Sequence, residues 1–260
     1  MSDLRVTVCQ VDIEWQGKES NLKRFAALIS NLKGKTDLII FPETFTTGFC
    51  MNVPELAEEM SGRTVSWMKE QASKLNASIA GSILCEDGVT RHNRFVLVRP
   101  SGQVEHYDKR HLFSFGNEDK HFTAGKSRNI IDHTDWKLMP QVCYDLRFPV
   151  FSRNRKNELY DVLIYVANWP EARATAWQSL LVARAHENQC YVIGINRIGV
   201  DGMGINCKGG SMVVNPKGEV LSSSGEGEII ETISLSKSEL DDFRAKFRPL
   251  DDADEFELKL

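Results

Sequence analysis

Short, almost uninterrupted apolar runs recur along the chain and alternate with longer segments of helical periodicity. Residues 38–41 are four apolar residues between Asp37 and Pro42, and residues 162–167 form a similar run. Runs of this length are typical of strands that are buried between two layers of structure. Residues 20–33 instead carry their apolar side chains at helical spacing, which predicts an amphipathic helix.

The same patterns extend over the whole chain and predict an α/β fold. Predicted strands cover residues 4–11, 38–41, 78–84, 95–98, 104–107, 162–167, 191–196 and 229–233, with a further strand ending before residue 143 and a hairpin around residues 215–218. Predicted helices cover residues 20–33, 64–76, 151–159, 172–188 and 235–247, whereas residues 44–62 and 110–128 are expected to be loops. This alternation indicates two sheets, each covered by helices on one side. Since no linker interrupts it, we expect one domain over residues 1–260, with an acidic tail at 248–260.

Composition and charge exclude several classes of protein. The 260 residues carry a net charge of −4, so we expect no basic face for nucleic acid. The apolar runs are too short to cross a bilayer, and the N-terminus lacks the apolar core of a signal peptide, which predicts a cytoplasmic protein. Six scattered cysteines without a CxxC pair are expected to be free thiols. The six histidines show no metal-binding spacing, and the glycine-rich segment 199–204 does not open a clear helix, so we expect neither a metal nor another cofactor.

Three polar residues follow predicted strands and together suggest a catalytic site. Cys143 lies where a strand turns into a helix, Glu43 comes directly after Pro42, and Lys109 ends a short alternating strand. Strand ends can converge at one rim of a sheet. A thiol, a carboxylate and a cation then suit acyl transfer, as nucleophile, base and oxyanion partner. Taken singly, each residue has an ordinary explanation: a buried thiol, a hydrogen-bonded loop carboxylate and a solvated lysine.

The segments around these residues resemble the nitrilase superfamily of carbon–nitrogen hydrolases, and within it the omega-amidase branch. The resemblance runs from about residue 4 to the C-terminus. It rests on six motifs in order: Phe41-Pro-Glu-Thr-Phe-Thr-Thr-Gly-Phe49, Tyr107-Asp-Lys-Arg-His-Leu-Phe113, Cys143-Tyr-Asp-Leu-Arg-Phe-Pro149, Asn168-Trp-Pro170, Ala183-Arg-Ala-His-Glu-Asn-Gln189 and Gly194-Ile-Asn-Arg-Ile-Gly199. It implies a four-layer α-β-β-α sandwich and a homodimer or higher homo-oligomer, in which the C-terminal tail docks on a partner subunit.

The resemblance also implies roles for individual residues. Glu43 would act as the base and Cys143 as the nucleophile that forms a thioester. Lys109 and the backbone N–H of Tyr144 would hold the oxyanion. Glu118 matches a second glutamate that orients the lysine or the substrate, although its charged neighbours also allow a solvated loop carboxylate.

The implied substrate carries a free carboxylate, for which an arginine is the natural partner. Arg173, next to a predicted helix start, is the first candidate and Arg147 the second; either could instead pair with a structural acid such as Asp145. Candidate pocket walls are Phe45, Phe115 and Trp169, for which core packing is an equally good account. Gly210 departs from the family pattern, in which many members carry a polar residue at this point.

Together these features predict an omega-amidase. It would hydrolyse the terminal amide of 2-oxo dicarboxylic acid monoamides, such as 2-oxoglutaramate and 2-oxosuccinamate. Another amidase, an N-carbamoyl hydrolase or a nitrilase of the same superfamily remains an alternative, because the same triad serves all of them. A non-catalytic scaffold or binding protein that retains the fold is the alternative outside enzymes.

Overall fold

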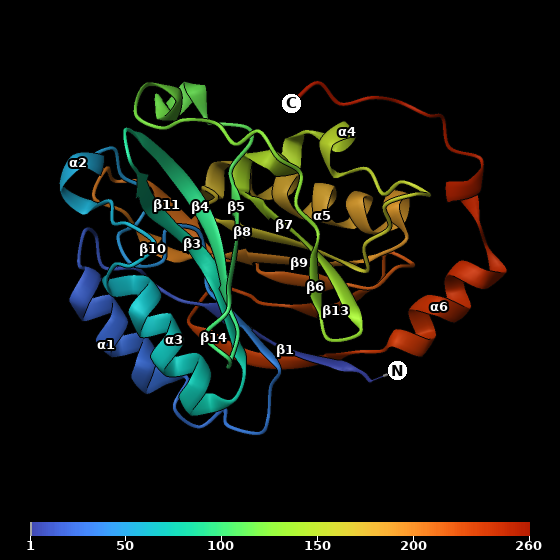
Figure 1. Ribbon diagram of the computed structural model, residues 1–260, viewed down its shortest axis with the longest axis horizontal. Coiled ribbons are helices and arrows are strands. Elements are labelled where there is room, and N and C mark those ends of the chain that lie inside the picture. The colour runs from blue at the N-terminus through green and yellow to red at the C-terminus, as the bar shows by residue number, and fades with distance from the viewer. Residues whose placement is uncertain (1) are drawn as a thin grey trace.

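Two six-stranded β-sheets packed face to face form the centre of the protein (Figure 1). The coordinates are those of a computed structural model, which describes residues 2–260. Helices cover the outer face of each sheet, so the layers run helix, sheet, sheet, helix. The predicted four-layer α-β-β-α sandwich is therefore confirmed.

The first sheet has the strand order β14-β1-β2-β3-β4-β5. Its strands are β14 (Ile229–Leu235), β1 (Leu4–Gln10), β2 (Leu38–Ile40), β3 (Ser78–Asp87), β4 (Thr90–Val98) and β5 (Val104–Asp108). β1, β2 and β3 are parallel, and the other neighbours pair antiparallel. Helices α1 (Lys18–Leu28) and α3 (Arg63–Leu75) lie side by side on its outer face (Figure 1).

The second sheet has the order β13-β12-β9-β8-β7-β6. Its strands are β13 (Val220–Ser223), β12 (Met212–Val214), β9 (Tyr191–Asn196), β8 (Val162–Ala167), β7 (Trp136–Val142) and β6 (Ile131–His133). Helix α5 (Ala174–Asn188) covers its outer face, and the short α4 (Pro149–Ser152) follows β7. A separate ribbon pairs β10 (Ile198–Val200) with β11 (Asn206–Lys208), and α6 (Lys237–Lys246) follows β14.

Strand β2 shows why the buried runs are apolar on both sides. Successive side chains of a strand point to opposite faces of the sheet. Leu38 and Ile40 accordingly lie in the core between the two sheets, whereas Ile39 and Phe41 pack beneath α1 and α3. Full burial of one such side chain contributes about 1.5–3 kcal/mol. Water touches neither face, so a polar residue in this run would lose hydration without gaining a partner.

Two predicted helix ends were wrong for local reasons, and one segment expected to be loop contains a helix. The helix predicted over 20–33 ends at Leu28, because the Ser30 hydroxyl donates to the carbonyl of Ala27 at 2.8 Å and draws the chain into a turn. The helix predicted over 151–159 stops at Ser152, since the Asn154 side chain bonds the backbone at both Tyr160 and Asn188. The segment 44–62, expected to be loop, contains the short helix α2 (Val53–Leu56).

The tail after α6 runs along one side of the molecule and ends near α4 (Figure 1). Leu258 packs against the hydrophobic core beside α4, and Arg110 Nη2 donates to the carbonyl of Lys259 at 3.4 Å. Docking of the tail on a partner subunit stays a prediction. Within residues 2–260, no helix has both the length and the apolar character needed to cross a membrane.

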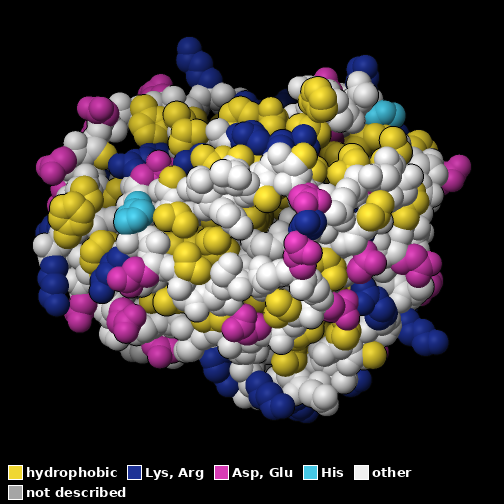
Figure 2. Space-filling view, turned by 180° about the vertical axis from the view of Figure 1, so that it is seen from behind, with side chains coloured by type: hydrophobic (Ala, Val, Ile, Leu, Met, Phe, Trp, Pro, Cys, Tyr) yellow, Lys and Arg dark blue, Asp and Glu magenta, His cyan; other side chains and the backbone are white. Residues whose placement is uncertain are grey.

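One face of the molecule is shown in Figure 2. Acidic and basic side chains are interspersed over most of it, with hydrophobic side chains between them. On this face the charges of both signs lie within a few side chains of one another.

Candidate active site

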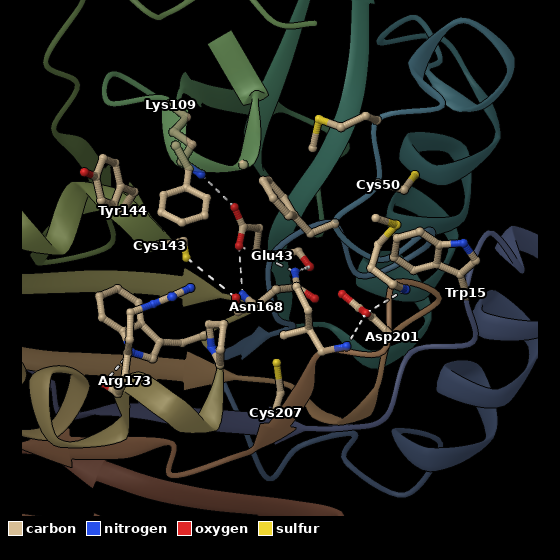
Figure 3. Close-up of a pocket in the computed structure, with 18 of the residues that line it drawn as sticks. Trp15, Glu43, Cys50, Lys109, Cys143, Tyr144, Asn168, Arg173, Asp201 and Cys207 are labelled. Atoms are coloured by element: carbon tan, nitrogen blue, oxygen red, sulfur yellow. Dashed lines mark hydrogen bonds and ion pairs between the residues drawn. The ribbon is translucent and has the colours of Figure 1, made fainter. Parts of the chain in front are cut away.

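Glu43, Lys109 and Cys143 come together at one rim of the two sheets (Figure 3). Each follows the end of a strand: Glu43 comes after β2, Lys109 after β5 and Cys143 after β7. Lys109 Nζ lies 2.9 Å from Glu43 Oε1, and both side chains are almost fully buried. The Cys143 Sγ lies 4.0 Å from the carbonyl oxygen of Asn168 at the end of β8. The convergence expected from the sequence is thus present in the fold.

Cys143 sits in a strained turn. It is the first residue of a 3₁₀-helix, Cys143–Arg147, and has a φ of +45°, a left-handed value that costs a residue with a Cβ about 1–3 kcal/mol. Backbone N–H groups in a first helical turn have no partner within the helix. The N–H of Tyr144 is therefore free of intrahelical bonding beside the thiol.

Glu118 is a buried neighbour of Lys109, so the alternative of a solvated loop carboxylate is wrong. Its side chain is 0% exposed, and its two oxygens lie 3.0 and 2.9 Å from Lys109 Nζ. The backbone N–H of Phe113 donates to Glu118 Oε2 at 2.6 Å. One lysine thus bridges two carboxylates in the interior.

Asn93 in β4 completes this network and was not predicted. Its amide nitrogen donates to Glu43 Oε1 at 2.8 Å and to Glu118 Oε1 at 3.1 Å. Its oxygen accepts from the Ser82 hydroxyl at 2.9 Å, which leaves the amide in one orientation. A sequence signal existed: Asn93 is in phase with Phe95, a core residue two positions on, so its polar side chain had to point inward.

Asn168 fixes the other oxygen of Glu43. Its backbone N–H donates to Glu43 Oε2 at 2.8 Å, and its side-chain amide donates to the Glu43 carbonyl at 2.7 Å and to Thr44 Oγ1 at 3.1 Å. The carboxylate of Glu43 is therefore held on both oxygens. Such contacts leave it little freedom to rotate.

The electrostatics of the site favour a neutral thiol at Cys143. Burial and then the charge of Glu43 raise the pKa of Cys143 well above its usual value, although Lys109 acts in the opposite direction. Burial alone would lower the pKa of Lys109, but the charges of Glu118 and Glu43 outweigh it and raise that pKa. With one cation between two carboxylates, a thiolate would add further negative charge.

Burial also raises the pKa of Glu118, partly offset by Lys109. The hydrogen bonds argue nevertheless for an ionised Glu118, because its polar contacts among residues 2–260 are all donors. A protonated carboxyl would need an acceptor there. The resting site thus contains two carboxylates, one ammonium and one thiol.

A cavity of about 230 Å³ opens above the thiol. Of the predicted substrate-binding residues, Arg147, Arg173 and Trp169 line it, as does Tyr144, whose backbone N–H is the predicted oxyanion donor. Other lining residues were not predicted and come from distant segments: Trp15, Phe49, Met51, Phe113, Gly116, Asp201, Met203 and Ile205. Cys50 and Cys207 also line the cavity.

Two predicted wall residues do not line the pocket. Phe45 is fully buried beneath α1 and α3, where its ring stacks on Phe41 with centroids 5.1 Å apart. The chain reverses at Thr44, which has a φ of +44° and turns Phe45 towards the helices. Phe115 points outward and is 86% exposed. Its neighbour Phe113 lines the pocket instead, because its backbone is anchored to Glu118.

Two guanidinium groups lie in the pocket wall on aromatic rings. The Arg147 guanidinium lies 5.0 Å from the centroid of Trp169, and that of Arg173 lies 5.4 Å from the centroid of Phe113. Within residues 2–260, neither forms an ion pair with a carboxylate. The suggestion that either pairs with Asp145 is wrong, since that carboxylate accepts from Tyr107, His111 and the backbone of Val142.

The turn between β10 and β11 forms one side of the pocket. The glycine-rich segment 199–204, expected to be a plain loop, joins two paired strands and brings Asp201 and Met203 to the cavity. A Cβ at Gly202 would lie 2.4 Å from the indole of Trp15, so only glycine permits this approach. Among residues 2–260, no group of three or more His, Cys, Asp or Glu side chains is arranged to hold a metal ion.

Comparison with known proteins gives consistent results. The family model for carbon–nitrogen hydrolases matches residues 5–242. Omega-amidase YafV of Escherichia coli K12 is 43% identical over 99% of this chain and 100% of its own. A 2-oxoglutaramate amidase of Bacillus subtilis is 31% identical over 95% of this chain and 96% of its own. A crystal structure of a CN-hydrolase superfamily protein from Xanthomonas campestris, with an arsenic adduct in its active site, superposes with a TM-score of 0.97 at 42% identity, covering 99% of this chain and 100% of that one.

Proposed function

The chain belongs to the carbon–nitrogen hydrolase family, and on this premise we propose that it is an omega-amidase, an amidohydrolase for linear amides. Its substrates would be 2-oxo dicarboxylic acid monoamides such as 2-oxoglutaramate and 2-oxosuccinamate, released as the acid and ammonia. One observation carries the proposal: the buried pair Glu43–Lys109 and the half-buried Cys143 share a small pocket with two arginines that have no carboxylate partner among residues 2–260. The relatives named omega-amidase YafV and 2-oxoglutaramate amidase support the same activity.

The first half-reaction makes an acyl-enzyme. The Cys143 sulfur attacks the amide carbon while its proton moves to Glu43, so a thiolate need not exist beforehand. The amide oxygen gains the negative charge and is held by the Lys109 ammonium and the N–H of Tyr144. The C–N bond then breaks, and the proton on Glu43 passes to the leaving nitrogen. Ammonia departs and a thioester remains.

The second half-reaction reverses the movement of the proton. Glu43 deprotonates a water molecule, the hydroxide oxygen attacks the thioester carbon, and the same two groups hold the second oxyanion. The C–S bond breaks, the proton on Glu43 passes to the Cys143 sulfur, and the acid product leaves. Glu43 acts in turn as base, acid, base and acid, and its fixed contacts with Asn168 and Lys109 suit this repeated use.

The size and chemistry of the pocket fit a short acid amide. A cavity of about 150 Å³ holds benzene, so one of about 230 Å³ suits a molecule of roughly ten non-hydrogen atoms, the size of 2-oxoglutaramate. The substrate methylene groups would lie against aromatic walls such as Trp169. The free carboxylate would pair with Arg173 or Arg147, both of which stack on rings that limit their movement.

Two further properties of the enzyme are its cellular location and its oligomeric state. We propose a cytoplasmic location, supported by six cysteines that are all free thiols in a fold that does not pair them. The homodimer or higher homo-oligomer expected from the family resemblance stays a prediction.

The decisive experiment measures ammonia release from 2-oxoglutaramate, 2-oxosuccinamate, glutamine and a simple nitrile, with the wild type and Cys143→Ala side by side. Release from the 2-oxo amides, far weaker release from the nitrile, and loss in the variant would support the proposal. Preference for another amide, a carbamoyl compound or the nitrile would reassign the substrate within the family. Full activity of Cys143→Ala would remove Cys143 as the nucleophile.

A further inference from the structure

Asp145 is a fully buried carboxylate next to the active site that takes no part in the two half-reactions. Asp145 lies in the 3₁₀-turn of the nucleophile and is 0% exposed. Its Oδ1 accepts from both the backbone N–H and the ring Nδ1 of His111, at 2.9 and 2.7 Å. Its Oδ2 accepts from the Tyr107 hydroxyl and from the backbone N–H of Val142, both at 2.9 Å.

These four hydrogen bonds join two segments that are far apart in the sequence. Tyr107 and His111 bracket Lys109, whereas Val142 and Asp145 bracket Cys143. The segment 107–111 continues β5 of the first sheet, and the segment 142–145 continues β7 of the second. We propose that Asp145 is a positioning residue, which sets the distance between the Lys109 ammonium and the Cys143 thiol by tying the lysine segment to the nucleophile turn. The inference rests on the proposed roles of Lys109 and Cys143.

The environment of Asp145 makes this tie rigid. The Tyr107 hydroxyl also accepts from the backbone N–H of Arg110 at 3.0 Å, which adds a third point of attachment on the lysine segment. The His111 ring is stacked on Phe148 with centroids 3.9 Å apart and planes 7° apart, so it cannot turn freely. Phe148 ends the same 3₁₀-turn that begins at Cys143. The two segments are thus joined on both sides of the carboxylate.

The backbone at Cys143 explains why such a tie is needed. A left-handed φ at a residue with a Cβ persists only where the surroundings fix it. The bond from the Val142 N–H to Asp145 closes the turn over Cys143 from within. Without it, the strained turn can relax and move the sulfur away from Lys109 and Glu43.

The four groups around Asp145 act as donors, which gives a sharp test. A carboxylate only accepts, so His111 Nδ1 carries the proton in this contact. In Asp145→Asn, the side chain keeps its shape, but an NH₂ group replaces one oxygen and faces donors. The matched control is Asp161→Asn. Asp161 is another buried carboxylate, directly before β8 and away from the pocket. It accepts from the N–H of Lys137 and from Arg244, both at 3.0 Å, and pairs with Lys237 at 2.8 Å.

The experiment compares kcat, KM, thermal unfolding and the rate of Cys143 alkylation by iodoacetamide for the wild type and both variants. For Asp145→Asn we expect kcat for 2-oxoglutaramate to fall about 100-fold, the loss typical of a displacement of about 1 Å, with KM changed less than about threefold. Alkylation should slow as well. Asp161→Asn should lose a similar amount of stability while keeping kcat and alkylation near wild type.

Several results would overturn the inference. One is a kcat and an alkylation rate near wild type in folded Asp145→Asn; another is an equal loss of kcat in Asp161→Asn at equal stability. If Asp145→Asn does not fold, Tyr107→Phe removes one of the four bonds and should lower kcat about tenfold without raising KM. An unchanged kcat in that variant would contradict the role. Alkylation needs no substrate and therefore tests Asp145 independently. If the wild type is inactive on 2-oxoglutaramate but is alkylated faster than Asp145→Asn, the proposed substrate is refuted and the role of Asp145 is supported.

Discussion

Lys109→Met separates two tasks that one side chain performs. The Lys109 ammonium lies 2.9 Å from Glu43 and 2.9–3.0 Å from Glu118, and all three side chains are buried. Methionine has a similar length but no charge. The substitution therefore removes the cation between two carboxylates and the proposed oxyanion partner at the same time.

The stability cost follows from the buried charges. Removing one partner of a buried ion pair costs about 3–5 kcal/mol, because an uncompensated charge remains. Without the lysine, the pKa of Glu118, already raised by burial, rises further. A carboxyl group with a raised folded-state pKa contributes stability that is present at low pH and is lost as the pH rises through that pKa. The destabilisation should thus be smallest near pH 4–5 and grow towards neutral pH.

The double variant Lys109→Met/Glu118→Gln is the matched control. It removes one negative charge together with the cation, so most of the lost stability should return. The activity should not return: loss of one oxyanion donor costs about 2.7–4 kcal/mol in the transition state, or about 10²–10³-fold in kcat. In the double variant, stability should therefore recover while kcat stays low.

Urea unfolding at pH 4.5 and pH 7.5 measures the first effect, and ammonia release measures the second. If Lys109→Met lowers the free energy of unfolding by less than about 1 kcal/mol at neutral pH, this would contradict the inference that Glu43 and Glu118 are both ionised. A double variant with kcat restored would show that Lys109 only neutralises its neighbours. It would remove the lysine from oxyanion binding.

Three further predictions concern the pocket and the thiol. Arg173→Ala should raise KM for acidic amides about 10–100-fold and leave KM for neutral amides nearly unchanged, because a hydrogen bond between charged groups is worth about 1.5–3 kcal/mol. Arg147→Ala is tested in parallel, and an equal rise for both kinds of amide would remove that arginine from carboxylate binding. Since burial and Glu43 raise the pKa of Cys143, the rate of its alkylation should still be climbing above pH 9; a plateau near neutral pH would contradict the neutral resting thiol. Gly202→Ala should raise KM, because its methyl group would lie 2.4 Å from the Trp15 indole and shift the β10–β11 turn, whereas Gly225→Ala, with open space around it, should not.

Much of the fold and the three central residues of the site could be predicted from the sequence, because local sequence patterns determine them. The apolar run at residues 38–41 needs cover on both faces, whatever its neighbours are, and this alone demands a layered fold. A polar residue directly after such a strand has to lie at the rim of its sheet. Glu43, Lys109 and Cys143 could therefore be assigned to one edge, and the family resemblance grouped them.

The rest of the site depends on contacts between segments that no local pattern links. Phe45 and Phe115 were expected in the pocket wall. A left-handed turn at Thr44 instead directs Phe45 towards the helices, and the anchoring of Phe113 by Glu118 places Phe113 in the wall in place of Phe115. Asn93 was missed because its two carboxylate partners lie 50 and 25 residues away.

Tertiary packing likewise decided the surroundings of the two arginines and of Asp145. Whether an arginine meets a carboxylate depends on which buried acids are already satisfied, and Asp145 is fully engaged by Tyr107, His111 and Val142. The sequence by itself determined the strands, the layers and the reactive groups at their ends. Only the folded chain decided which way each loop side chain points, because a loop has no fixed periodicity and its side chains turn wherever distant segments leave space and hydrogen-bond partners.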